Sequence, residues 1–147
     1  MADIKCIERI VTTPYSAEQM FDLVNDVDHY PDFLPWCGGV QIYKRSHDAM
    51  HVRVNIKFKA LQPYFETYNT LTRPTQINMK LMKGPFEHFS GAWQFNSIED
   101  GSQIIFKLQY CFSNSLLGMI IGPFFDHIIS TFVDSFIKQA NLRYGSQ

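Results

Sequence analysis

The chain has 147 residues, which is the size of a single domain with its own hydrophobic core. Its formal net charge is −1, so no overall positive field would draw it to DNA. The three cysteines form no C-x-x-C pair, and an odd count without a secretory signal peptide favours reduced thiols in a cytoplasmic protein. We therefore predict one cytoplasmic domain over residues 1–147.

The first part of the chain predicts a strand, a short helix and a stiff apolar connection. The strand covers residues 4–12 and ends before Pro14. Ser16 is a candidate N-cap with Gln19 three residues later, which is the capping-box pattern, and the helix that follows ends near Asn25. The connection over residues 24–37 contains two prolines among large apolar side chains, so it admits one helical turn at most. It either plugs a closed core or covers the mouth of a cavity.

Alternation of apolar and polar residues predicts a run of about six strands after this connection. One of them places Val52, Val54, Ile56 and Phe58 on its inner face. Turns are expected at residues 83–85 and at 99–102. The other strands that the alternation defines cover residues 65–72, 77–81, 89–95 and 104–112.

The chain closes with a long predicted helix from Ser115 to Arg143. Pro123 is expected to kink this helix or to separate a short leading turn from it. The longest apolar run, Leu116 to Phe125, is too short to cross a bilayer, so no transmembrane segment is predicted. An apolar stripe follows helical spacing through Phe125, Ile128, Ile129, Phe132, Phe136 and Ala140.

An antiparallel sheet with one solvated face has to bury the other face, and this helix is its only large apolar partner. We therefore predict an α+β fold in which a curved antiparallel sheet wraps around the long C-terminal helix.

Catalytic and metal-binding patterns are weak. His47 and His51 are expected to straddle a turn, and the aspartates of residues 26–32 lack the glycine and the terminal glutamate of a calcium loop, so no metal site is predicted. No G-x-S-x-G is present. General acid–base chemistry would need a polar group in the core, and Tyr68 and Tyr110 are more simply core tyrosines. We expect a protein that is not an enzyme and has no cofactor.

Several motifs resemble one known family. Residues 26–37 carry D-V-D-H-Y-P-D-F-L-P-W-C, and further matching pieces are P-Y-S-A-E-Q-M-F-D-L-V-N at 14–25, N-T-L at 69–71, G-P-F at 84–86, G-A-W-Q-F at 91–95 and F-F-D-H-I-I at 124–129. The chain is similar, over nearly its whole length, to a START-like family described as polyketide cyclase or lipid-transport domains. That family includes coenzyme Q-binding proteins and bacterial ribosome association toxins. The resemblance implies a helix-grip fold that can enclose an apolar cavity between sheet and helix.

The resemblance implies a non-enzymatic binding protein for ubiquinone or a related lipid, acting as a quinone chaperone in respiration. The cavity would open near residues 33–36, beside the helix start at residues 116–121. The candidate ligand-binding residues are Tyr30, Phe33, Leu34, Pro35, Trp36, Val54, Ile56, Phe58, Met79, Leu81, Trp93, Phe95, Phe106, Leu108, Leu117, Ile121, Phe124, Ile128 and Phe132.

The same resemblance leaves an alternative open, a ribosome association toxin that binds the large ribosomal subunit and blocks subunit joining. Its contact would be an outward basic strand face that carries Arg53, Lys57 and Lys59 and projects away from any cavity. Lys44, Arg45 and Lys80 could extend this face. A cyclase or an isomerase is the third and weakest possibility.

Overall fold

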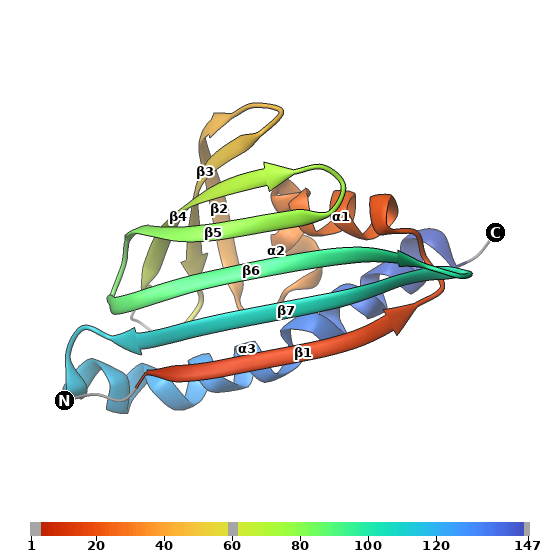
Figure 1. Ribbon diagram of the computed structural model, residues 1–147. Coiled ribbons are helices and arrows are strands. Elements are labelled where there is room, and N and C mark those ends of the chain that lie inside the picture. The colour runs from red at the N-terminus through yellow and green to blue at the C-terminus, as the bar shows by residue number, and fades with distance from the viewer. Residues whose placement is uncertain (1–3, 59–61, 146–147) are drawn as a thin grey trace.

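One antiparallel sheet and one long helix make up most of the molecule (Figure 1). The computed structural model describes residues 4–58 and 62–145. The sheet has seven strands in the order β1-β7-β6-β5-β4-β3-β2, and every neighbouring pair is antiparallel. Helix α3 crosses its concave face, and the short helices α1 and α2 cover the remaining part (Figure 1). The predicted α+β architecture is confirmed.

The elements follow the predicted order. The helices are α1 (Ala17–Asn25), the 3-10 turn η1 (Val27–His29), α2 (Tyr30–Phe33) and α3 (Ser115–Tyr144). The strands are β1 (Lys5–Thr13), β2 (Cys37–Arg45), β3 (Ala49–Ile56), β4 (Tyr64–Thr72), β5 (Gln76–Lys83), β6 (Phe86–Ile98) and β7 (Gly101–Phe112).

Strand β2 is the one strand for which the alternation of apolar and polar residues predicted no bounds. Its pairing with β3 shifts register between Cys37 and Gly39 and again between Ile42 and Lys44. Each bulge places two residues opposite one and breaks the period of two. Register shifts also occur between β4 and β5, at Glu66 and Thr67, and between β6 and β7, at Phe86 and His88, but the rest of these strands keeps the period that predicts them.

The predicted capping box begins α1. The Ser16 hydroxyl oxygen accepts the Gln19 backbone N–H at 3.0 Å, and the Gln19 side chain accepts the Ser16 backbone N–H at 2.9 Å. These two backbone N–H groups would otherwise have no hydrogen-bond partner within the helix. The capping box fixes the first residue of α1 and therefore the position from which the connection over residues 24–37 begins.

Helix α3 is continuous through Pro123, so the separate leading turn is wrong. A proline lacks the N–H that would bond four residues back, to the carbonyl of Met119. Met119 and Pro123 both lie on the exposed side of the helix, where water can satisfy that carbonyl. By length and composition α3 could cross a membrane, but a core helix of a soluble protein passes the same test, and the buried side of α3 packs in the hydrophobic core.

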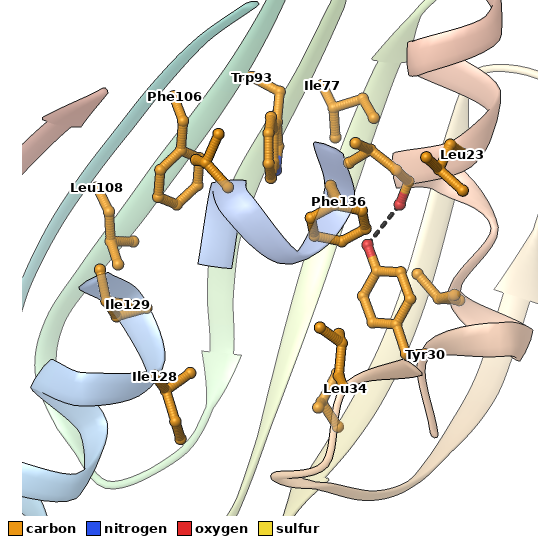
Figure 2. Packing of buried hydrophobic residues seen from close by; sticks show 14 of the residues in the cluster. Leu23, Tyr30, Leu34, Ile77, Trp93, Phe106, Leu108, Ile128, Ile129 and Phe136 are labelled. Atoms are coloured by element: carbon orange, nitrogen blue, oxygen red, sulfur yellow. Dashed lines mark hydrogen bonds between the residues drawn. The ribbon is translucent and has the colours of Figure 1, made fainter. Parts of the chain in front are cut away.

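The apolar stripe of α3 forms the centre of the core. Phe136 is 1% exposed, and its ring centroid lies 5.4 Å from that of Trp93 on β6 and 5.0 Å from that of Phe132. Figure 2 shows Phe136 between the sheet residues and the α1–α2 region. Phe132 is only half-buried, whereas Val133 is 1% exposed although the predicted stripe omitted it.

Tyr30 locks the connection onto both α1 and α3. Its hydroxyl donates a hydrogen bond to the Val24 carbonyl at the end of α1 (Figure 2). Its ring lies edge-on to Phe136, with 5.4 Å between centroids, and packs on Phe33 at 6.0 Å. Burial, with smaller contributions from Cys37 and Asp26, raises the pKa of Tyr30 far above its ordinary value of 10.0.

Replacing Phe136 by alanine should lower the free energy of unfolding by about 3–5 kcal/mol, because a fully buried ring is lost from the centre of the core. Urea unfolding measures this. Leu142→Ala, at a side chain 69% exposed on the same helix, should change stability by less than about 0.5 kcal/mol. Equal losses in the two variants would mean that α3 is not anchored by this face.

Tyr30→Phe should cost about 1–3 kcal/mol, because the buried Val24 carbonyl loses its side-chain donor. The pH dependence gives a second measurement. The raised pKa keeps folded Tyr30 protonated while the unfolded tyrosine ionises, so its contribution is complete below pH 10.0 and declines above it. Stability of the variant should therefore fall less steeply above that pH. Tyr43→Phe, at a tyrosine 46% exposed, should behave like the parent.

Candidate functional site

An apolar cavity of about 70 Å³ lies between the sheet and α3. A water molecule needs roughly 10–15 Å³ of such volume, so the cavity has room for a few waters. A larger ligand fits only if the surrounding side chains or the connection move. The wall consists of Val27, Tyr30, Trp36, Val52, Val54, Phe65, Thr67, Asn69, Met79, Phe89, Trp93, Phe106, Leu108, Phe125, Ile128, Ile129 and Phe132.

About half of the predicted ligand residues line this cavity. They come from the connection, four strands and α3, and they are Tyr30, Trp36, Val54, Met79, Trp93, Phe106, Leu108, Ile128 and Phe132. The others lie outside its wall, namely Phe33, Leu34, Pro35, Ile56, Phe58, Leu81, Phe95, Leu117, Ile121 and Phe124.

Residues outside the wall have other packing partners. The Phe95 ring lies 5.7 Å from that of Phe21 on α1, deep in the core. Phe58 and Phe124 contact each other, with 4.9 Å between ring centroids. Leu34 is completely buried. Strand alternation identifies the inward face, but it does not tell which part of that face is covered by α1.

The sequence-based list of ligand-binding residues omitted eight residues of the wall, and two reasons account for six of them. Val52, Phe89, Phe125 and Ile129 were recognised as inward or apolar-stripe residues but were not selected. The polar composition of β4 hid Thr67 and Asn69, whose inward direction follows from pairing: Thr67 is opposite Val52, and Asn69 is opposite Met79. Val27 and Phe65 complete the set.

A thin wall separates the cavity from the surface. Trp36 and Ile128 line both the cavity and an outer groove of about 390 Å³. The groove is also lined by Pro35, Lys57, Phe124, His127, Thr131 and Ser135. Displacement of the Trp36 side chain would join the two spaces.

The predicted position of the opening needs correction. The connection does not lie beside residues 116–121. Trp36 packs on Phe132, with 6.0 Å between ring centroids, and Phe33 packs on Phe136 at 5.4 Å. The first turns of α3 instead approach Phe112 at the end of β7. Since α3 crosses the sheet lengthwise, its start lies at the end remote from α1 and α2 (Figure 1).

No acid or base faces the cavity among the residues that the structure describes. Among the described wall residues Tyr30 is the only one with a titratable side chain, and its hydroxyl donates to the Val24 carbonyl. Tyr110 bonds to Asp126 instead, and burial with that hydrogen bond raises its pKa. Cys37 is 1% exposed, and burial raises the pKa of its thiol, which disfavours the thiolate form.

The basic outer face differs from its prediction in two respects. Arg53 is half-buried: its guanidinium lies 3.6 Å above the Tyr64 ring, and its Nε donates to Asn55 at 3.1 Å. Lys57 is exposed but follows the end of β3 and lines the groove beside Trp36, so it does not project away from the cavity entrance. Lys59 lies outside the described residues.

Two of the three further predicted cations belong to this face. Lys44 and Lys80 are exposed, and within residues 4–58 and 62–145 neither forms an ion pair. Arg45 does not belong to it, because it lies opposite the core residue Met50 and pairs with Asp28 at 2.9 Å.

Comparison with curated proteins gives relatives that match 90% or more of this chain. The ribosome association toxin RatA of Pseudomonas aeruginosa is 36% identical over 140 residues, covering 95% of this chain and 97% of that protein. The mitochondrial coenzyme Q-binding protein COQ10 homolog B of Xenopus laevis is 26% identical over 138 residues, covering 90% of this chain and 57% of that protein.

Solved structures share the fold. An aromatase/cyclase from a Streptomyces species superposes with a TM-score of 0.78 at 14% identity, covering 98% of this chain and 99% of its own. A START superfamily protein from Mycobacterium smegmatis gives 0.70 at 16% identity, covering 91% and 95%. The predicted START-like helix-grip fold is confirmed. The family model for polyketide cyclase/dehydrase and lipid transport matches residues 13–137, and this chain belongs to that family.

Proposed function

We propose that this protein is a non-enzymatic binding protein for an apolar ligand of the quinone or isoprenoid lipid type. The observation that carries the proposal is the cavity between sheet and α3, which has a largely apolar wall and shares Trp36 and Ile128 with a surface groove. Apolar walls with few polar groups are typical of small-molecule sites.

The composition of the wall favours a flat ring with an apolar tail. Trp36, Trp93, Phe106 and Phe132 offer aromatic faces and edges against which a ring can pack. Met79 is flexible enough to adapt the wall to an entering group. The outer groove, lined in part by Pro35 and Phe124, could hold a tail. The name of the Xenopus relative, a coenzyme Q-binding protein, agrees with this choice.

The described cavity wall also favours binding over catalysis. General acid–base chemistry requires a proton donor or acceptor within hydrogen-bond reach of the substrate. The Tyr30 hydroxyl donates its hydrogen bond to the Val24 carbonyl, so its proton is not available to a substrate in this arrangement. The likeness to an aromatase/cyclase at 14% identity concerns the fold alone.

Quinone binding should quench the intrinsic fluorescence, because both tryptophans of the chain line the cavity. Titration with a short-chain ubiquinone should give saturable quenching. Val54→Phe should weaken binding at least about tenfold, because the larger side chain fills the cavity.

Val40→Phe is the matched control. Val40 is the direct partner of Val54 on β2 but does not line the cavity. Its affinity should stay near that of the parent, and thermal melts should establish that both variants fold. Absence of saturable quenching in the parent, or equal affinity in the two variants, would reject the proposed site.

A second function is favoured by the RatA relative, whose name describes ribosome association and whose identity is higher than that of the coenzyme Q-binding relative. We propose that association with the large ribosomal subunit would use the outer basic face, through Arg53 and Lys57 with Lys44 and Lys80. Arg53 lies on the side of β3 opposite the cavity wall, whereas Lys57 borders the groove at the cavity entrance, so the two proposed functions share this one residue.

Arg53→Glu combined with Lys57→Glu should abolish co-sedimentation with the large subunit. The parent's association should weaken steeply with salt, because cations that neutralise phosphates release counterions. Lys107→Glu makes the same kind of charge change on β7, far across the sheet, and should leave co-sedimentation unchanged. Binding that survives the double reversal, or ignores salt, would rule out this surface.

A further inference from the structure

A polar pair sits in the otherwise apolar cavity wall. The Thr67 hydroxyl donates a hydrogen bond of 2.9 Å to the Asn69 side-chain oxygen, and both residues point inward from β4. Thr67 is 3% exposed and Asn69 is 6% exposed. Both line the cavity.

The Asn69 amide has unused hydrogen-bonding capacity. A primary amide offers one acceptor oxygen and two N–H donors. Its oxygen accepts from Thr67, and none of the hydrogen bonds of the described residues uses its nitrogen. The nitrogen is not one of their fully buried unpaired atoms, of which His88 Nε2 is the only one, so it keeps contact with accessible space. The residues directly opposite Asn69 on the two neighbouring strands are Met50 and Met79, which cannot accept strongly.

Buried polar groups are almost always hydrogen-bonded, because leaving a donor unpaired in apolar surroundings is costly. Leucine is similar in size to asparagine and would suit this inward strand position better. An amide nitrogen that borders a cavity and has no protein partner is satisfied by what enters the cavity, either water, for which there is room, or a polar atom of a ligand.

The geometry points to Asn69 as the residue that selects the ligand's head group, through hydrogen bonds to an acceptor oxygen such as a quinone carbonyl. This inference rests on the proposed ligand binding and adds the requirement that the ligand carry an acceptor oxygen. The apolar wall accepts any suitably shaped hydrocarbon, whereas the Asn69 amide distinguishes a ring that carries carbonyl oxygens from one that lacks them. Thr67 is a positioning residue, because its hydroxyl fixes the amide oxygen and so directs the nitrogen.

The test compares two probes with the same tail. One is a benzoquinone with a single isoprenoid unit, and the other is the benzene analogue without carbonyls, used as a competitor in the fluorescence titration. The parent should prefer the quinone by about tenfold, which corresponds to about 1.4 kcal/mol. Asn69→Leu should remove this preference by weakening quinone binding, while affinity for the benzene analogue stays the same or increases.

Asn78→Leu is the matched control, since it makes the same substitution on the exposed outward face of β5. It should retain the parent's preference. If Asn69→Leu is poorly folded, the double variant Thr67→Val and Asn69→Leu replaces both polar partners by apolar groups of similar shape and so leaves no orphaned hydroxyl. It should show the same loss of preference.

Infrared spectroscopy provides a readout that a merely structural role would not alter. The carbonyl stretch of the bound quinone should lie at lower frequency in the parent and in Asn78→Leu than in Asn69→Leu. A parent that binds both probes equally, or an Asn69→Leu variant that keeps the preference and the frequency shift, would overturn the role of Asn69 and leave apolar ligand binding intact. A parent that binds neither probe would overturn both.

Discussion

The packing of α3 against the concave face of the sheet is the interaction on which the rest of the structure depends. Trp93 is the centre of this contact, with ring centroids 4.6 Å from Phe106, 5.7 Å from Phe132 and 5.4 Å from Phe136. Two of these ring pairs are tilted and the third, with Phe136, is edge to face. The cavity lies where this aromatic contact meets Ile128 and the strands beyond it, so one layer of residues provides both stability and the candidate site.

Periodicity was sufficient to predict the layers of this fold. The inward sets of β3, β6 and β7 and the stripe of α3 follow from spacing, because each element has one solvated and one buried side. The cavity was harder to predict. Phe95 and Trp93 have the same spacing on β6 and similar burial, yet only Trp93 faces the cavity, because α1 covers Phe95. Such a difference depends on where a third element rests, and no local pattern encodes it.

The motif of residues 26–37 marked this segment as important, but the sequence did not decide whether it plugs the core or covers a cavity. Its Tyr30 ties the segment to α1 and α3, whereas its Trp36 forms the boundary with the groove. The first keeps the connection in place, and the second is the side chain whose movement would admit a ligand. The position of the segment along α3 was wrong in the sequence-based prediction, because spacing along a helix does not tell which end of a sheet it crosses first.

The two outer strands of the open sheet bear on how the protein behaves at high concentration. An unpaired strand edge can recruit a second chain and lead to aggregation. The β2 edge is interrupted by two bulges, and it ends in Lys44 and Arg45. On the β1 edge, Lys5 and Arg9 reach across to Asp126 and Asp134 of α3, at 2.5 Å and 2.9 Å. Charge at one edge and irregularity at the other both oppose edge-to-edge association. A sheet that stays open to accommodate a helix therefore need not become a template for fibrils.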